Sequence, residues 1–239
     1  MPSNYFKVGL IIPSSNTVME PDFHRKLGAH CAISSSRIYL EEVTRQAEEV
    51  MIEEDLPKAL RLIKTTDPHV LVFGCTSAGS LGGLDSDAGI ARRIEQLTGV
   101  RALTVVGSIV QQLKTIRPRN VAVFTPYRED LTLSVAQCVV AAGYELVKTA
   151  GMGILSNRDI GRVAPAEIVE FVASQMDGCD VDCIFLSCTN WQAIDAIAPL
   201  EARFGVPVIT SNQATIATVQ SLLSDFEQVP TVSSGARAG

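Results

Sequence analysis

The chain repeats itself with an offset of 113 residues. Residues 8–13 (VGLIIP) resemble residues 121–126 (VAVFTP), and residues 70–76 (VLVFGCT) resemble residues 183–189 (CIFLSCT). After one deletion, residues 94–100 match residues 200–206, and each of these segments leads into another apolar run. Several matches in one register indicate two similar halves, each with a strand that ends in proline and a strand that ends in Cys-Thr.

Continuous apolar runs alternate with helix-length segments along both halves. Runs without polar alternation are typical of parallel strands buried on both faces. We predict strands at 8–12, 70–73, 102–106, 121–124, 183–186 and 206–209, and helices within 43–64, 88–97, 108–116, 165–176 and 214–223. Strands and helices in this order predict an α/β fold with mostly parallel, Rossmann-like sheets.

The repeat also predicts the domain organisation. Residues 1–119 would form the first half, 120–226 the second half, and 227–239 a flexible tail. We expect the last helix to cross over and pack on the first half. We expect the two halves to be related by pseudo-twofold symmetry, with a binding site in the cleft where the carboxyl ends of their strands meet.

Composition excludes several classes of protein. The 239 residues are 46% apolar and 19% charged, which argues against general disorder. A net charge of -6 and the lack of long basic runs disfavour nucleic-acid partners. No apolar stretch approaches the ~20 residues that span a bilayer, and residues 1–15 do not resemble a signal peptide. We therefore expect a soluble cytoplasmic protein.

The chain has six cysteines, and we expect all of them to be free thiols in that compartment. No Cys-x-x-Cys pair and no histidine spacing suggests a metal site. For Cys31, Cys138, Cys179 and Cys183 we predict the ordinary role of a small apolar residue.

Cys75 and Cys188 differ because they occupy equivalent positions of the repeat and both precede threonine. If each cysteine lies between a strand and a helix N-terminus, the unpaired N–H groups there would lower the pKa of its thiol. The same N–H groups could hold a substrate carboxylate. The adjacent polar side chains that could assist are Thr76, Ser77, Thr189 and Asn190. Two thiols across a cleft suit proton transfer on two faces of a carbon, or attack on one face with protonation from another side.

Residues 9–20 (GLIIPSSNTVME), together with the two Cys-Thr loops, resemble the aspartate/glutamate racemase superfamily, and more narrowly its maleate cis-trans isomerase and arylmalonate decarboxylase branch. The resemblance covers about residues 6–223. It implies cofactor-independent chemistry on a small carboxylate substrate and a homodimer or larger homo-oligomer. It also implies that Cys75 is the nucleophile and Cys188 the proton donor.

The same resemblance implies that Asn16 grips a substrate carboxylate and that Tyr127 and Asn157 contact the substrate. Ser14 and Tyr127 occupy equivalent loop positions of the repeat, and so do Thr44 and Asn157. Ser14 is therefore a further candidate for substrate binding.

Arylmalonate decarboxylases carry glycine where Cys75 stands, so the two thiols favour an isomerase of an unsaturated dicarboxylate such as maleate. A two-cysteine racemase of amino acids or hydantoins, or a related decarboxylase, is the alternative. A third possibility is a small-molecule binding protein without catalysis.

Two other segments have simpler interpretations. The stretch from Glu41 to Asp55 is rich in acidic residues, Glu48 among them, and predicts a solvated helix face. The glycines between Gly79 and Gly83 predict a mobile segment that helps to close the site.

Overall fold

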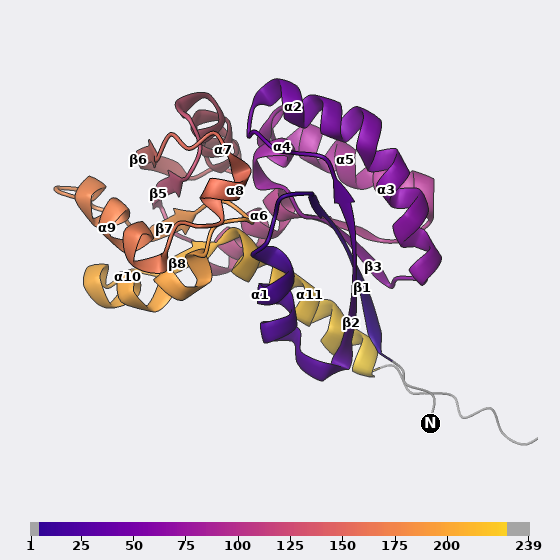
Figure 1. Ribbon diagram of the computed structural model, residues 1–239. Helices are drawn as coiled ribbons and strands as arrows, with labels where there is room; N and C mark the ends of the chain where they lie inside the picture. Colours follow the sequence, from indigo (N-terminus) through magenta and orange to yellow (C-terminus); the bar gives the residue numbers. More distant parts are fainter. Residues whose placement is uncertain (1–4, 229–239) are drawn as a thin grey trace, which may run out of the picture.

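The computed structural model describes residues 5–228, which form two four-stranded sheets with helices around them (Figure 1). The strand orders are β2-β1-β3-β4 and β6-β5-β7-β8, and every pairing is parallel. One sheet comes from each half of the repeat, so the predicted α/β fold is confirmed.

The first half alternates strands with helices, and its central strands carry the continuous apolar runs of the sequence. Its elements are β1 (Phe6–Pro13), α1 (Met19–Leu27), η1 (Gly28–His30), β2 (Cys31–Ile38), α2 (Arg45–Val50), η2 (Met51–Asp55), α3 (Leu56–Ile63), η3 (Lys64–Thr66), β3 (Val70–Phe73), α4 (Thr76–Ser80), α5 (Gly83–Thr98), β4 (Ala102–Thr104) and α6 (Val105–Ile116).

The second half repeats this alternation of strands and helices. Its elements are β5 (Asn120–Thr125), α7 (Glu129–Ala141), β6 (Glu145–Gly151), α8 (Asn157–Ile160), α9 (Pro165–Gln175), β7 (Cys183–Leu186), η4 (Ala193–Ala196), α10 (Ile197–Phe204), β8 (Val208–Thr210) and α11 (Ser211–Gln228).

Equivalent hydrogen bonds occur in the two halves. The N–H of Gly74 donates to the carbonyl of Ile11 at 2.7 Å, and the N–H of Ser187 donates to that of Phe124 at 2.8 Å. Both donors and acceptors are 113 residues apart. These bonds extend the pairing of the two central strands by one residue, directly before each Cys-Thr pair.

The strands β2 and β6 were missed by the sequence analysis. Both lie at sheet edges, and most of their residues are only partly buried or exposed. An edge strand that is half-exposed does not need a continuous apolar run, so the pattern used for the other strands could not detect these two.

Several predicted boundaries were also wrong. β4 ends at Thr104, whose hydroxyl accepts the N–H of Gly107 at 3.0 Å and caps α6, so residues 105 and 106 are helical. The predicted helix 43–64 divides into α2, a π-helical turn and α3. β8 begins at Val208 rather than at residue 206.

The last helix, α11, leaves β8 and crosses to the first half, where it lies beside α1 and α6 (Figure 1). Its Phe226 ring packs against Phe6 and His69, with ring centroids 5.4 and 4.8 Å away. Residues 227 and 228 of the predicted tail belong to this helix, and the rest of that segment lies outside the described residues. Among residues 5–228, no helix combines the length and apolar content that crossing a bilayer requires.

Candidate active site

The two Cys-Thr loops meet at the junction of the halves. Cys75 follows β3 and Cys188 follows β7, and each cysteine is 4% exposed. The hydroxyl of Thr189 donates to the carbonyl of Gly74 at 3.0 Å and accepts the Asn16 side-chain amide at 3.0 Å. The loop of the second half is therefore bound directly to two loops of the first half.

Cys188 is surrounded by donors. The backbone N–H of Asn190 approaches its sulfur at 3.3 Å, and Trp191 provides a second backbone N–H. The hydroxyl of the fully enclosed Tyr127 also bonds to this sulfur. Burial raises the pKa of Tyr127 well above its ordinary value, and the neighbouring Cys188 adds to that increase. Tyr127 therefore stays protonated and serves as a donor.

The predicted asparagines connect the halves. Asn190 donates from its amide to the carbonyl of Asn157 at 2.6 Å and accepts the N–H of Thr17 at 2.9 Å. Asn157 donates to the hydroxyl of Ser15 at 2.8 Å. Asn16, Asn157 and Asn190 are all buried, so this polar network holds the loops of both halves in one arrangement.

Asn16 also has a structural function. Its side-chain oxygen accepts the N–H groups of Val18 and Met19, both at 3.0 Å, at the start of α1. This leaves its amide nitrogen as the part that faces the second half, through Thr189.

The remaining predicted residues take different positions. Thr76 donates to the hydroxyl of Ser211 at 2.9 Å, which ties the start of α4 to the start of α11. Ser77 is buried beside Cys75, with its oxygen 3.7 Å from the sulfur. Ser14 is exposed, and its hydroxyl accepts the N–H of Leu40 at 3.1 Å. Ser14 therefore lies at the exposed edge of the candidate site rather than among its buried polar groups.

The predicted lowering of the thiol pKa values was wrong. Burial raises the pKa of Cys75 far above its ordinary value, and the carboxyl of Glu48 adds to the increase. Burial likewise raises the pKa of Cys188 to about 12, although Tyr127 and two backbone N–H groups oppose it. The helix after Cys75 has five residues, and a turn rather than a helix directly follows Cys188. The dipole of so short a helix cannot compensate for the hydration that the buried thiolates lose.

Glu48 was predicted to lie on a solvated face, and the structure places it in the site instead. It is 0% exposed and accepts the hydroxyl of Ser77 through Oε1. Burial raises the pKa of Glu48 to about 8. The sequence signal that could have found it is helical spacing, because Glu48 lies three residues before the fully buried Met51.

The first two residues of the segment predicted to be mobile are packed, whereas Gly82 is exposed. Gly79 and Ser80 are buried within α4, and a Cβ on Gly79 would lie 2.7 Å from Oδ1 of Asp87. Gly79 therefore permits close contact between α4 and α5.

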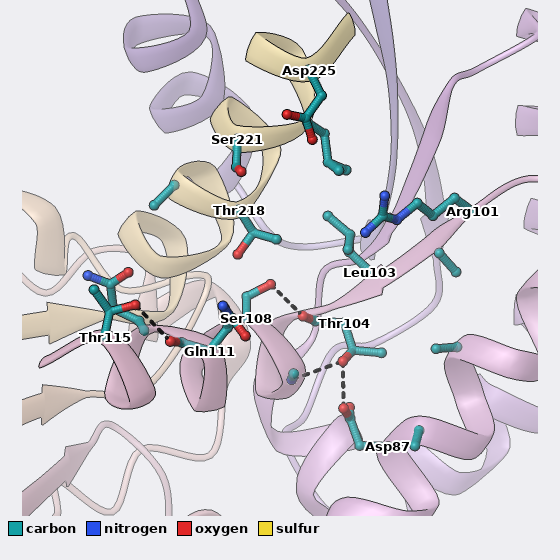
Figure 2. A pocket seen from close by; sticks show the side chains of 17 residues that line it. Asp87, Arg101, Leu103, Thr104, Ser108, Gln111, Thr115, Thr218, Ser221 and Asp225 are labelled. Atoms are coloured by element: carbon teal, nitrogen blue, oxygen red, sulfur yellow. Dashed lines mark hydrogen bonds between the residues drawn. The ribbon is translucent and has the colours of Figure 1, made fainter. Parts of the chain in front are cut away.

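A separate cavity of about 680 Å³ lies beside β4, between α5, α6 and α11. Figure 2 shows Ser221 and Asp225 of α11 on one side of it and Asp87 on the other. Neither thiol of the candidate site lines this cavity. Within the described part of the chain, no three His, Cys, Asp or Glu side chains are grouped as metal ligands would be.

The fold defines an α/β protein of two similar halves, with two equivalent cysteines buried where the halves meet. The family model for arylmalonate decarboxylase matches residues 8–234. Maleate isomerase of Pseudomonas putida is 30% identical over 240 residues, covering 95% of this chain and 94% of the relative. Maleate isomerase of Geobacillus stearothermophilus is 25% identical over 246 residues, covering 97% of each.

A crystal structure of a Pseudomonas putida maleate isomerase matches with a TM-score of 0.86 and 25% identity, covering 92% of this chain and 93% of that one. The chain therefore belongs to the arylmalonate decarboxylase family, in the branch that includes maleate isomerases, and the resemblance found in the sequence is confirmed.

Proposed function

We propose that this protein is a cofactor-independent cis-trans isomerase of a small unsaturated dicarboxylate, of the maleate-to-fumarate type. The observation that carries the proposal is the enclosed pair Cys75 and Cys188, one from each half, with Tyr127 bonded to the second sulfur. The relatives named as maleate isomerases support the same chemistry.

In this mechanism the Cys75 sulfur adds to one alkene carbon. The π electron pair moves onto the adjacent carboxylate, which becomes enediolate-like, and Cys188 protonates the carbon next to the new C–S bond. Rotation about the resulting single bond follows. Cys188 then removes the proton, the double bond re-forms and the Cys75 sulfur leaves.

Neutral donors hold the negative charge in this proposal. The buried polar residues found between positions 5 and 228 include no lysine or arginine. We assign carboxylate binding to the side-chain amides of Asn16 and Asn157, each of which has two N–H protons, with the backbone N–H groups beside the thiols. The hydroxyl protons of Thr76 and Thr189 are donated to Ser211 and to the Gly74 carbonyl, so these side chains hold the loops in place. Donors that are already oriented in a buried site stabilise developing charge without reorganising.

Three finer properties belong to the same proposal. The reaction needs no cofactor, because addition to and elimination from the activated alkene use only the two thiols. We also propose a cytoplasmic location, supported by six free cysteines, and a homodimer or larger homo-oligomer, supported by family resemblance.

The test is to incubate the protein with maleate in deuterated water and to follow fumarate by NMR. Cys75→Ser and Cys188→Ser should each reduce turnover by at least ~1,000-fold, because a serine hydroxyl is a much weaker nucleophile and acid than a thiol. Cys31→Ser, in the edge strand β2, is the control and should retain wild-type turnover. Substantial turnover by Cys75→Ser would contradict the proposal.

Racemisation is the alternative for the same two thiols. A panel of amino acids and hydantoins in deuterated water distinguishes it, because a two-base racemase must exchange the α-hydrogen with solvent. Deuterium at the α-carbon of such a substrate, with no conversion of maleate, would replace the isomerase by a racemase.

A further inference from the structure

Glu48 is an ionisable group at the candidate site that the two-thiol mechanism leaves unused. It lies on α2, which packs against α4 directly after Cys75 (Figure 1). Its Oε1 accepts the hydroxyl of Ser77, whereas its equally buried Oε2 has no hydrogen-bond partner. A carboxyl that is fully buried with one free oxygen is costly, so a specific use for that oxygen is expected.

When Glu48 is ionised, the hydrogen bonds around Ser77 have one direction. A serine hydroxyl has a single proton, and that of Ser77 is donated to Glu48. The sulfur of Cys75 lies 3.7 Å from the Ser77 oxygen, so in this arrangement the thiol is the donor. The chain therefore runs from the Cys75 S–H through the Ser77 hydroxyl to the Glu48 carboxyl.

We propose that Glu48 accepts the proton of the Cys75 thiol through the hydroxyl of Ser77. The S–H bond breaks as its proton moves to the Ser77 oxygen, while the original Ser77 proton moves to Glu48. The electron pair stays on sulfur and forms the new C–S bond, and elimination reverses the transfer. As a role in catalysis this inference rests on the proposed function, in which Cys75 is the nucleophile.

The surroundings of Cys75 make such an acceptor necessary. Five-residue α4 cannot offset the burial that raises the pKa of this thiol, so the free thiolate is scarce at neutral pH. Transfer to an adjacent carboxylate, concerted with attack on the alkene, avoids forming an isolated buried thiolate.

The charge of Glu48 depends on groups from every element around it. These are Arg45 on its own helix, Asp130 on α7, and the site residues Cys75, Cys188 and Tyr127. With a pKa of about 8, Glu48 is ionised in about one-tenth of molecules at pH 7. Transfer to Glu48 should therefore become faster as the pH rises toward 8.

Substitution of Glu48 separates a proton acceptor from a mere neighbouring charge. Removing a negative charge lowers the pKa of Cys75, so a purely electrostatic neighbour predicts that Glu48→Gln makes the thiol more reactive. A proton acceptor predicts the opposite, because glutamine cannot take the proton.

The experiment measures alkylation of Cys75 by iodoacetamide between pH 6 and 10, with peptide mass spectrometry to identify the modified residue. In the wild type, the rate should rise about tenfold per pH unit up to about pH 8 and then level off. Glu48→Gln and Ser77→Ala should each lower the rate at pH 8 at least tenfold and remove this inflection. Glu49→Gln, an exposed carboxylate on the same helix, is the matched control and should follow the wild type.

Two results would overturn the inference: an equal or faster rate in Glu48→Gln, or a wild-type Cys75 that reacts no faster than the buried Cys138. Ser77→Ala tests the relay independently if Glu48→Gln does not fold. Alkylation does not use maleate, so a protein that fails to isomerise maleate yet shows this profile contradicts only the proposed function. An isomerase with unchanged alkylation in Glu48→Gln contradicts only the relay.

Discussion

Gly79 allows α4 to approach α5 closely beside the buried Asp87. We expect Gly79→Ala to destabilise the protein by about 1–3 kcal/mol, because the new methyl group would lie 2.7 Å from Asp87 Oδ1 and 3.1 Å from a methyl of Val106. Equilibrium denaturation by urea measures this change.

Gly89, in the middle of α5, is the matched control. A Cβ there would meet only the end of the Arg92 side chain, at 3.8 Å. Gly89→Ala should therefore stabilise the protein by about 0.5–1 kcal/mol, because alanine favours the helix. Equal effects of the two substitutions would show that close packing at Gly79 is not important.

At the residue scale, the sequence singled out the two thiols but not their environment. The repeat distinguishes Cys75 and Cys188 from four other cysteines because it compares positions within one chain. The repeat does not single out Glu48, because this residue has no catalytic counterpart in the second half. Glu48 also lies among other acidic residues. The thiol pKa values were predicted in the wrong direction because the extent of burial depends on how the two halves pack.

At the element scale, apolar runs locate the strands that are mostly buried, including the edge strands β4 and β8. Residues 70–73 and 183–186 were predicted with their observed boundaries as β3 and β7. The edge strands β2 and β6 were missed because half-exposed strands tolerate polar residues. Helix starts depend on capping side chains such as Thr104, which shortened a predicted strand.

The edge strands β4 and β8 share an anchor that comes from the preceding helix. Ala102 N–H donates to the carboxylate of Glu95, and Val208 N–H to that of Glu201, both at 3.0 Å. Glu201→Ala leaves the N–H of the buried Val208 unpaired, and we expect a loss of about 1–2 kcal/mol in urea denaturation.

The control for this prediction is Glu170→Ala on α9. Glu170 is exposed, and among residues 5–228 it pairs only with Arg203, at 3.5 Å, so its removal should cost less than about 0.5 kcal/mol. A cost for Glu201→Ala no larger than that of Glu170→Ala would contradict the anchoring role.

At the scale of the whole molecule, Asp87 makes stability depend on pH. Burial raises its pKa to about 7, so between pH 4 and 7 the folded state binds more protons than the unfolded state. The contribution of Asp87 to the free energy of unfolding should therefore fall as the pH rises through this range and stay constant above it. Asp87→Asn should remove this fall, measured as the stability difference from wild type at pH 5 and pH 8.

Asp85→Asn, an exposed change on the same helix, should preserve the wild-type difference between the two pH values. Glu48 likewise lowers the free energy of unfolding as the pH rises to about 8. This contribution of Glu48 persists in Asp87→Asn. An unchanged pH dependence in Asp87→Asn would contradict this role for Asp87.

The path of α11 has a consequence for the order in which the molecule can be completed. This helix follows all eight strands of the described residues, yet it lies against α1 and α6 of the first half. During synthesis from the N-terminus, the first sheet and its helices emerge long before the segment that covers them. The surfaces of α1 and α6 that α11 covers therefore stay exposed until the second half has been synthesised, so the two halves of the repeat reach their final packing together.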